Sequence, residues 1–147
     1  MKISARNILS GRVERVVKGA VNAEVDLQLA GGEKIAAIIT NASVDTLGLA
    51  VGIAAFAIIK ASNVMVGKGL ESAKLSARNI LPGTVSGVQE GAVSSEITIR
   101  LAGGTPVVAS ITKASVAALA LKSGDSVSAI IKASNVMVGV ETSSGRP

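Results

Sequence analysis

The chain is an internal repeat, in which residues 4–67 return as residues 76–139 at a constant offset of 72 without a gap. Of the 64 aligned residues, 37 are identical in the two copies. Self-similarity of this kind indicates one supersecondary unit used twice, with its apolar surface covered by a neighbouring unit. Because the two copies fold alike, a polar residue kept in both is tied to a shared geometry or a shared ligand.

The repeat divides the 147 residues into a first domain at 1–67, a linker at 68–75, a second domain at 76–140 and a polar tail at 141–147. A unit of about 65 residues buries only about 60% of its unfolded surface. The chain has no Cys and no His, so neither a disulfide nor a zinc site built on these residues can hold the unit together. We therefore expect packing between copies and an oligomer.

The sequence predicts a cytoplasmic protein without membrane contact. The absence of Cys fits a reducing compartment, and Met1 and Lys2 are not followed by the apolar segment of a signal peptide. The apolar run at residues 47–59 is shorter than the roughly 20 residues that a membrane span needs. Its twin at 119–131 carries Lys122 and Asp125, which belong in water or at a turn.

The apolar pattern predicts strands and one short helix in each copy. Residues 21–29 and 93–101 alternate apolar and polar side chains, which is typical of a half-buried strand. The Gly pairs at 31–32 and 103–104 predict a hairpin turn. Further strands are expected near residues 12–17, 33–40, 54–60 and 64–66 and at the equivalent positions of the second copy, where Pro106 suggests an edge strand.

Ser43 and Ser115 are expected to cap the helix, which would run to about Leu49 or Leu121 and stop before Gly52 or Gly124. Three strands, a short helix and one or two further strands form the element order of an OB-like barrel. We therefore predict an all-β protein with two tandem OB-like five-stranded β-barrels, each with a short helix.

The residues offer little catalytic chemistry. Without His or Cys, the common general base, the thiolate nucleophile and the usual transition-metal ligands are missing. Glu24 and its twin Glu96 are the only retained acid, so paired carboxylates for hydrolysis or calcium are not available. No P-loop occurs, and the Ser-x-x-Lys match at residues 110–113 is lost at 38–41. We expect a protein that is not an enzyme and uses no organic cofactor.

Two polar clusters are kept nearly whole. Ser-Ala-Arg-Asn stands at residues 4–7 and 76–79, and Lys-Ala-Ser-Asn stands at 60–63 and 132–135. Arg and Lys supply charged N–H donors, Ser supplies an O–H, and a small Ala lets an anion approach the backbone N–H groups. Together they are typical of a site for a small oxyanion. The competing interpretation is that they open and close strands, with Ser and Asn completing turns and the cations solvated.

Two further retained segments have a structural explanation. Gly-Ala-Val at residues 19–21 and 91–93 is typical of a tight turn. Thr and Ser at 40 and 43, and at 112 and 115, are typical of a helix start and its cap.

These segments carry a family resemblance. The Ser-Ala-Arg-Asn opening, the Gly-Ala-Val-x-x-Glu segment, the Thr-x-x-Ser-Val-x-x-Leu segment and the Ile-Lys-Ala-Ser-Asn-Val-Met-Val-Gly ending resemble the Mop domain in order and spacing. Two copies in tandem resemble the di-Mop molbindins. The resemblance implies an OB-like barrel, a homotrimer, and binding of molybdate or tungstate at interfaces between domains. It also implies a role in molybdate storage and homeostasis, although delivery and sensing fit the residues equally.

The resemblance further implies which residues hold the anion, with the two clusters contributed across an interface. The main set is Ser4, Ala5, Arg6, Asn7, Lys60, Ala61 and Ser62, with their twins Ser76, Ala77, Arg78, Asn79, Lys132, Ala133 and Ser134. A possible additional set is Gly19, Ala20, Val21, Thr40 and Ser43, with Gly91, Ala92, Val93, Thr112 and Ser115. Molybdenum would be held as molybdate through hydrogen bonds, with no protein atom on the metal.

A nucleic-acid partner is not expected, despite the net charge of +5. The cations retained in both copies are few: Lys2/Lys74, Arg6/Arg78 and Lys60/Lys132. OB-like barrels stack bases on aromatic side chains, whereas this chain has one aromatic residue, Phe56, whose twin is Ser128. An OB-like nucleic-acid-binding or oligomerisation module without oxyanion specificity stays as the alternative function.

Overall fold

The computed structural model describes residues 1–142, so most of the predicted tail at 141–147 lies outside the described residues. Each copy contributes three long strands, a short helix and two further strands. The first copy forms β1 (Asn7–Lys18), β2 (Asn22–Leu29), β3 (Lys34–Thr40), α1 (Asn41–Leu47), β4 (Ala54–Ile59) and β5 (Met65–Gly67). The second forms β6 (Asn79–Glu90), β7 (Ser94–Leu101), β8 (Pro106–Thr112), α2 (Lys113–Ala118), β9 (Ser126–Ile131) and β10 (Met137–Gly139).

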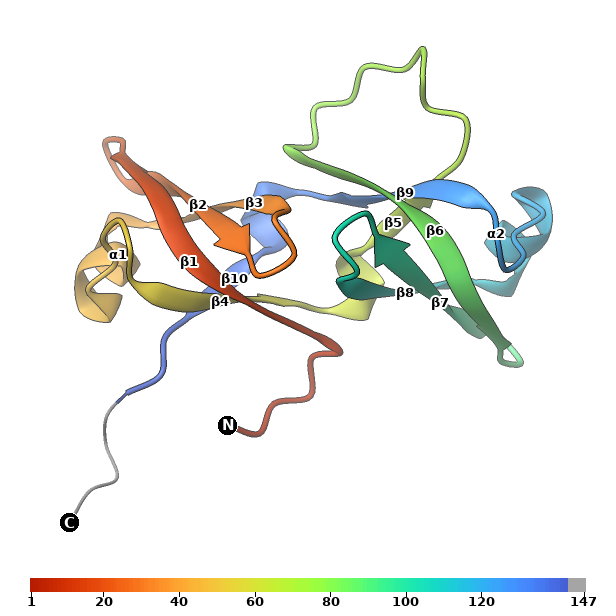
Figure 1. The fold of residues 1–147 in the computed structure, drawn as a ribbon, viewed down its shortest axis with the longest axis horizontal. Coiled ribbons are helices and arrows are strands. Elements are labelled where there is room, and N and C mark those ends of the chain that lie inside the picture. Colours follow the sequence, from red (N-terminus) through yellow and green to blue (C-terminus); the bar gives the residue numbers. More distant parts are fainter. Residues whose placement is uncertain (143–147) are drawn as a thin grey trace.

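The strands form two curled five-stranded sheets that exchange their last strands. One sheet has the order β10-β4-β1-β2-β3, and the other has the order β5-β9-β6-β7-β8. Each copy therefore supplies four strands of its own sheet and the fifth strand of the other, as Figure 1 shows for β10 beside β4. The prediction of two five-stranded OB-like units, each with one short helix, is confirmed. The exchange was not predicted.

The long first strand of each copy makes the curl possible. β1 pairs with both β2 and β4, and its register against β2 shifts between Val13 and Arg15. The twin strand β6 shifts between Val85 and Gly87. Such a bulge bends its strand and increases the local twist, so one strand can serve both sides of a curled sheet. Pro106 begins the edge strand β8, as predicted.

The helix begins earlier than the sequence suggested, because the capping residue is Thr40 and not Ser43. Thr40 Oγ1 accepts from Ser43 N at 3.0 Å, and its twin Thr112 accepts from Ser115 N at 3.1 Å. The helix also ends earlier, since Gly48 takes the left-handed C-cap conformation with φ 64°. Neither helix of residues 1–142 is long and apolar enough to cross a membrane.

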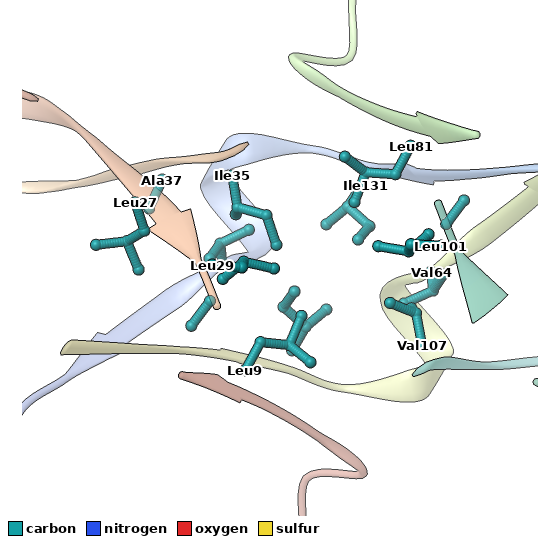
Figure 2. Packing of buried hydrophobic residues seen from close by; sticks show 14 of the residues in the cluster. Leu9, Leu27, Leu29, Ile35, Ala37, Val64, Leu81, Leu101, Val107 and Ile131 are labelled. Atoms are coloured by element: carbon teal, nitrogen blue, oxygen red, sulfur yellow. The ribbon is translucent and has the colours of Figure 1, made fainter. Parts of the chain in front are cut away.

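The core is continuous across both copies. Buried aliphatic side chains from the two sheets form one cluster, and Figure 2 shows Leu9, Leu29 and Ile35 facing Val64 and residues of the second copy at the centre. Val64 and its twin Val136, at 1% and 2% exposure, lie next to the exchanged strands. The expectation that the small units are stabilised by packing between copies is thus confirmed.

Candidate functional site

Strand pairing brings the two retained clusters of each copy to one place. β1 begins at Asn7 and pairs there with Ile59, the last residue of β4. Arg6 and Lys60 each lie one residue outside this pair, so the two clusters meet at the same strand ends. β6 and β9 repeat the arrangement, with Asn79 opposite Ile131. A single copy therefore presents Arg and Lys at one edge.

The Asn of the first cluster has a structural task. Asn7 is 2% exposed; its Nδ2 donates to Val108 O at 2.8 Å and to Ile59 O at 3.2 Å, and its Oδ1 accepts from Val108 N at 2.8 Å. Asn79 makes the equivalent contacts in the other direction, with both hydrogen bonds to the Ala36 backbone at 2.8 Å. We call these contacts of Asn7 and Asn79 the Asn brackets. These side-chain amides join the two copies. Asn7 Nδ2 has no N–H left for an anion, whereas Asn79 Nδ2 donates one of its two N–H groups to Ala36 O and belongs to a residue that is only 2% exposed. The backbone atoms of both residues are therefore the better candidates.

The Arg of the first cluster pairs with the other copy. Arg6 Nη1 lies 2.5 Å from Glu96 Oε1, and Arg78 pairs with Glu24 in the same way. The hydrogen bond from Arg78 holds the pKa of Glu24 below its usual value, and the same bond raises the pKa of Arg78. The sequence analysis identified Glu24 and Glu96 as the retained acid but assigned them no role. Because Arg6 and Arg78 are retained in the same way, the sequence already offered a hint that this acid and this Arg form a pair.

Arg6 also lines a surface hollow between the copies. Its volume is about 430 Å³, and it is lined by Arg6, Gly91, Ser94, Glu96 and Ser110, among others. The hollow thus joins Arg6 of the main set to Gly91 of the additional set, and the two come from different copies. Donor side chains surround it, together with two carboxylates, those of Glu90 and Glu96.

The charged side chains around Arg78 differ from those around its twin, Arg6. A hollow of about 210 Å³ is lined by Asp26, Lys34 and Ala36 together with Arg78 and Asn79. Burial, and then the charge of Glu24, raise the pKa of Asp26. The second copy has Thr and Pro in place of Asp26 and Lys34. The two Arg positions are therefore geometrically related but electrostatically unequal.

The remaining main-set residues differ in what they can offer. Lys60 and Ser62 are exposed, as are Ser4 and the twins of all three, so their donors face solvent. Ala61 is 8% exposed and its twin is similarly buried, so it can take part only through its backbone. Within residues 1–142, Lys60 and Lys132 have no carboxylate partner.

The additional set lies at the other end of each sheet from its own Arg. The turn at residues 19–21 joins β1 to β2, and Asn41 donates from N to Val21 O at 2.8 Å and from Nδ2 to Gly19 O at 2.9 Å. The hydroxyls of Thr40 and Ser43 bond to each other at 2.8 Å. These contacts explain both retained segments as a tight turn packed on a capped helix. No group of three metal-ligating side chains gathers anywhere in residues 1–142.

Comparison with known proteins gives one consistent relationship. The sequence matches the TOBE domain at residues 3–66 and again at 75–138. The molybdenum-pterin-binding protein MopA of Rhodobacter capsulatus is 42% identical over 95% of this chain, and the molybdenum transport protein ModE of Herbaspirillum seropedicae is 40% identical over 96%. The chain spans about half the length of these two relatives, 53% and 52% respectively.

A solved structure gives a match over its whole length. The cytoplasmic molybdate-binding protein ModG, with molybdate bound, superposes with a TM-score of 0.93 at 50% identity. The match covers 96% of this chain and 100% of that one. The two-copy arrangement is therefore shared with a protein of the same extent.

Proposed function

This chain belongs to the TOBE-domain family, and on that premise we propose that it binds molybdate as an intact oxyanion and serves in molybdenum storage and homeostasis. The observation that supports this proposal most directly is that the two retained clusters meet at the same strand ends in both copies. The 50% identity to a molybdate-bound protein over 96% of the chain supports the choice of anion. Tungstate, of the same charge and shape, is included as a ligand.

The chemistry of binding is hydrogen bonding to the four oxygens, without a protein atom on the metal. Charge-assisted hydrogen bonds contribute roughly 1.5–3 kcal/mol each, so several of them offset the desolvation of one dianion. Exposed Lys60 and Ser62, exposed Ser4 and nearby backbone N–H groups are the donors available at the strand ends. The proposal assigns no reaction to the site.

The two cations are expected to contribute unequally. Arg6 is already paired with Glu96, so a dianion near its guanidinium also meets a carboxylate. Lys60 carries its charge on a flexible stem, and no carboxylate of residues 1–142 pairs with it. We therefore assign the larger share of the binding free energy to Lys60 and Lys132.

The proposal includes a cytoplasmic homotrimer, in which neighbouring chains complete the sites. Large apolar side chains are exposed at matching positions of both copies: Ile8 and Ile80 at 39% each, Val21 and Val93 at 70% and 77%, and Met65 and Met137 at 48% and 47%. Matched exposure in both copies supports a repeated contact with other chains. Light scattering of the purified protein tests this assembly.

Calorimetric titration with molybdate, with sulfate and phosphate as competitors, tests the function. We expect saturable binding that resists excess phosphate, because the O–H of protonated phosphate faces donors at this site. Binding of oligonucleotides without any oxyanion binding would instead favour the nucleic-acid alternative. That alternative needs aromatic side chains on which bases stack. Phe56, the one aromatic residue of the chain, is half-buried opposite Gly139 and does not favour it.

Matched variants identify the residues. The pair Lys60→Ala/Lys132→Ala should weaken molybdate binding roughly tenfold to a hundredfold, the loss of one charge-assisted bond per site. Arg6→Ala/Arg78→Ala should weaken it less. The control is Arg100→Gln, which removes an exposed cation and installs the residue of its twin, Gln28. Equal effects of control and Lys variants would show that only net charge matters.

A further inference from the structure

The two hairpin turns of the molecule meet each other at its centre. Figure 1 shows the β2–β3 turn facing the β7–β8 turn between the two sheets. A Cβ atom on Gly103 would overlap the carbonyl oxygen of Gly31, and one on Gly31 would crowd the carbonyl oxygen of Gly103. The turns are therefore in backbone contact, and each lies against its own twin, as residues do on a two-fold axis.

Across this contact the two copies use different side chains. Glu33 Oε1 accepts from Gly103 N at 2.8 Å, and Glu33 Oε2 accepts from Thr105 Oγ1 at 3.0 Å. Thr105 is the twin of Glu33 in the repeat, and both residues are half-buried. We call these contacts of Glu33, Gly103 and Thr105 the hairpin clasp. One position of the repeat thus supplies the acceptor in the first copy and the donor in the second.

Apart from Lys68 of the linker, whose Nζ pairs with Asp125 of the second copy at 3.1 Å, the other polar contacts between the copies come in matched pairs. The Asn7 and Asn79 brackets bind main-chain atoms, and the two Arg–Glu pairs repeat each other. The exchanged strands β5 and β10 are the same tripeptide, Met-Val-Gly. All of these contacts would form equally well between the first copy of one chain and the first copy of another.

We propose that the hairpin clasp is a pairing code, which makes each copy accept its unlike twin and reject a like copy from another chain. Two first copies would bring two Glu33 carboxylates to one contact with no hydroxyl donor, and like charges repel there. Two second copies would bring two Thr105 residues and leave the turn N–H groups without a carboxylate.

The code has a consequence for assembly. Unlike pairing closes the strand exchange within one chain. Like pairing leaves each chain with an unpaired second copy that must find a further chain, and such contacts grow into open-ended chains. The clasp therefore favours a closed two-copy unit as the building block of any larger assembly. Neither Lys60 nor Arg6 takes part in the hydrogen bonds of the clasp, although Thr105 and Arg6 line one surface hollow.

A mutant cycle on the full chain tests the code. Thr105→Glu places two carboxylates at the contact and should lower the thermal midpoint by roughly 3–10 °C, as expected for losing a charge-assisted bond in a chain of this size. The double variant Glu33→Thr/Thr105→Glu exchanges the roles and should restore the midpoint to within about 2 °C. A double variant no better than the sum of the two single variants would overturn the proposal.

The single variant Glu33→Thr tests pairing without a charge clash. Both turns then carry Thr, so we expect larger species after refolding from denaturant, in a fraction that rises with protein concentration when measured by light scattering. Wild type and the double variant should refold to one size. If Glu33→Thr also refolds to that one size at every concentration, the clasp has no role in pairing.

Discussion

The short helix is followed by Gly48 in the first copy and by its twin Ala120, two residues beyond the helix, in the second. Both residues take a left-handed conformation, with φ of 64° and 48°, and both N–H groups bond to the carbonyl three residues earlier. Glycine adopts this conformation freely, whereas a residue with a Cβ loses about 1–2 kcal/mol in it. The two copies thus share a backbone while individual side chains suit it unequally.

Two other positions show the same contrast. Ala23 is buried in β2, and its twin Ser95 is buried at 1% exposure with a hydroxyl that has no hydrogen-bond partner among residues 1–142. Asp26 is partly buried beside Glu24, whereas its twin Thr98 carries no charge. The shared core and main-chain pairing hold the fold, so each copy tolerates some side chains that are less stabilising than their twins in the other copy. Exchanging them between copies measures what each is worth.

The largest effect is expected at a position where the copies agree. Asn7→Ala removes three hydrogen bonds and leaves the Val108 backbone unpaired, so it should lower the free energy of unfolding by about 3 kcal/mol. Asn79→Ala should cost slightly less, because the Asn79 side chain makes two hydrogen bonds, both to Ala36, whereas that of Asn7 makes three. Urea unfolding measures both. A loss below about 0.5 kcal/mol in either would show that the brackets do not join the copies.

The buried hydroxyl comes next. Ala23→Ser places an unpaired hydroxyl in the first copy and should cost about 2 kcal/mol, whereas Ser95→Ala removes one from the second and should gain about 1 kcal/mol. The two variants together therefore move the hydroxyl between related sites. Thermal and urea unfolding report the change; destabilisation by Ser95→Ala would mean that its hydroxyl has a partner in solution.

Exchanging the residue after the helix should change the free energy of unfolding by a smaller amount, with opposite signs in the two copies. Ala120→Gly should stabilise the protein by about 1 kcal/mol, and Gly48→Ala should destabilise it by about the same amount. The strain of a Cβ at positive φ exceeds the entropy that Gly adds to the unfolded chain. Calorimetric midpoints measure both variants, and a lower midpoint for Ala120→Gly would contradict the assignment.

The smallest effect is one of pH. Burial raises the pKa of Asp26, so its neutral form stabilises the fold fully below about pH 4, and this stability is lost as the pH rises through the raised pKa. Asp26→Thr should therefore gain more stability at pH 7 than at pH 4, by less than about 1 kcal/mol.

Glu24 titrates in the opposite sense and does not produce this difference. Its pKa is lowered by Arg78, so its stabilisation is present above the ordinary value and is lost on acidification through the lowered one. Urea unfolding of wild type and Asp26→Thr across this pH range gives the comparison. Parallel stability curves for the two proteins would contradict the role given to Asp26.

Local patterns identified most elements because the signals are local. The alternation over residues 21–29, the Gly pair of the hairpin and the edge position of Pro106 were read correctly. The helix cap was misplaced because Thr40 and Ser43 can both accept from a helix N-terminus at that spacing, and only the backbone geometry selects Thr40. The two polar clusters of a copy meet because of the register between its first and fourth strands. The sequence indicated only the order of the clusters along the chain and not this register.

What the sequence determined by itself is the unit: its strands, its helix, its turn chemistry and its use twice. What the tertiary structure decided is how the copies combine. The last strand is the same tripeptide in both copies, so its sequence does not indicate which sheet it joins. Asn7 looks like an anion donor in the chain and becomes a bracket only when Val108, 101 residues away, lies beside it. Long-range packing makes both choices, because a local pattern fixes backbone conformation but not the identity of the partner.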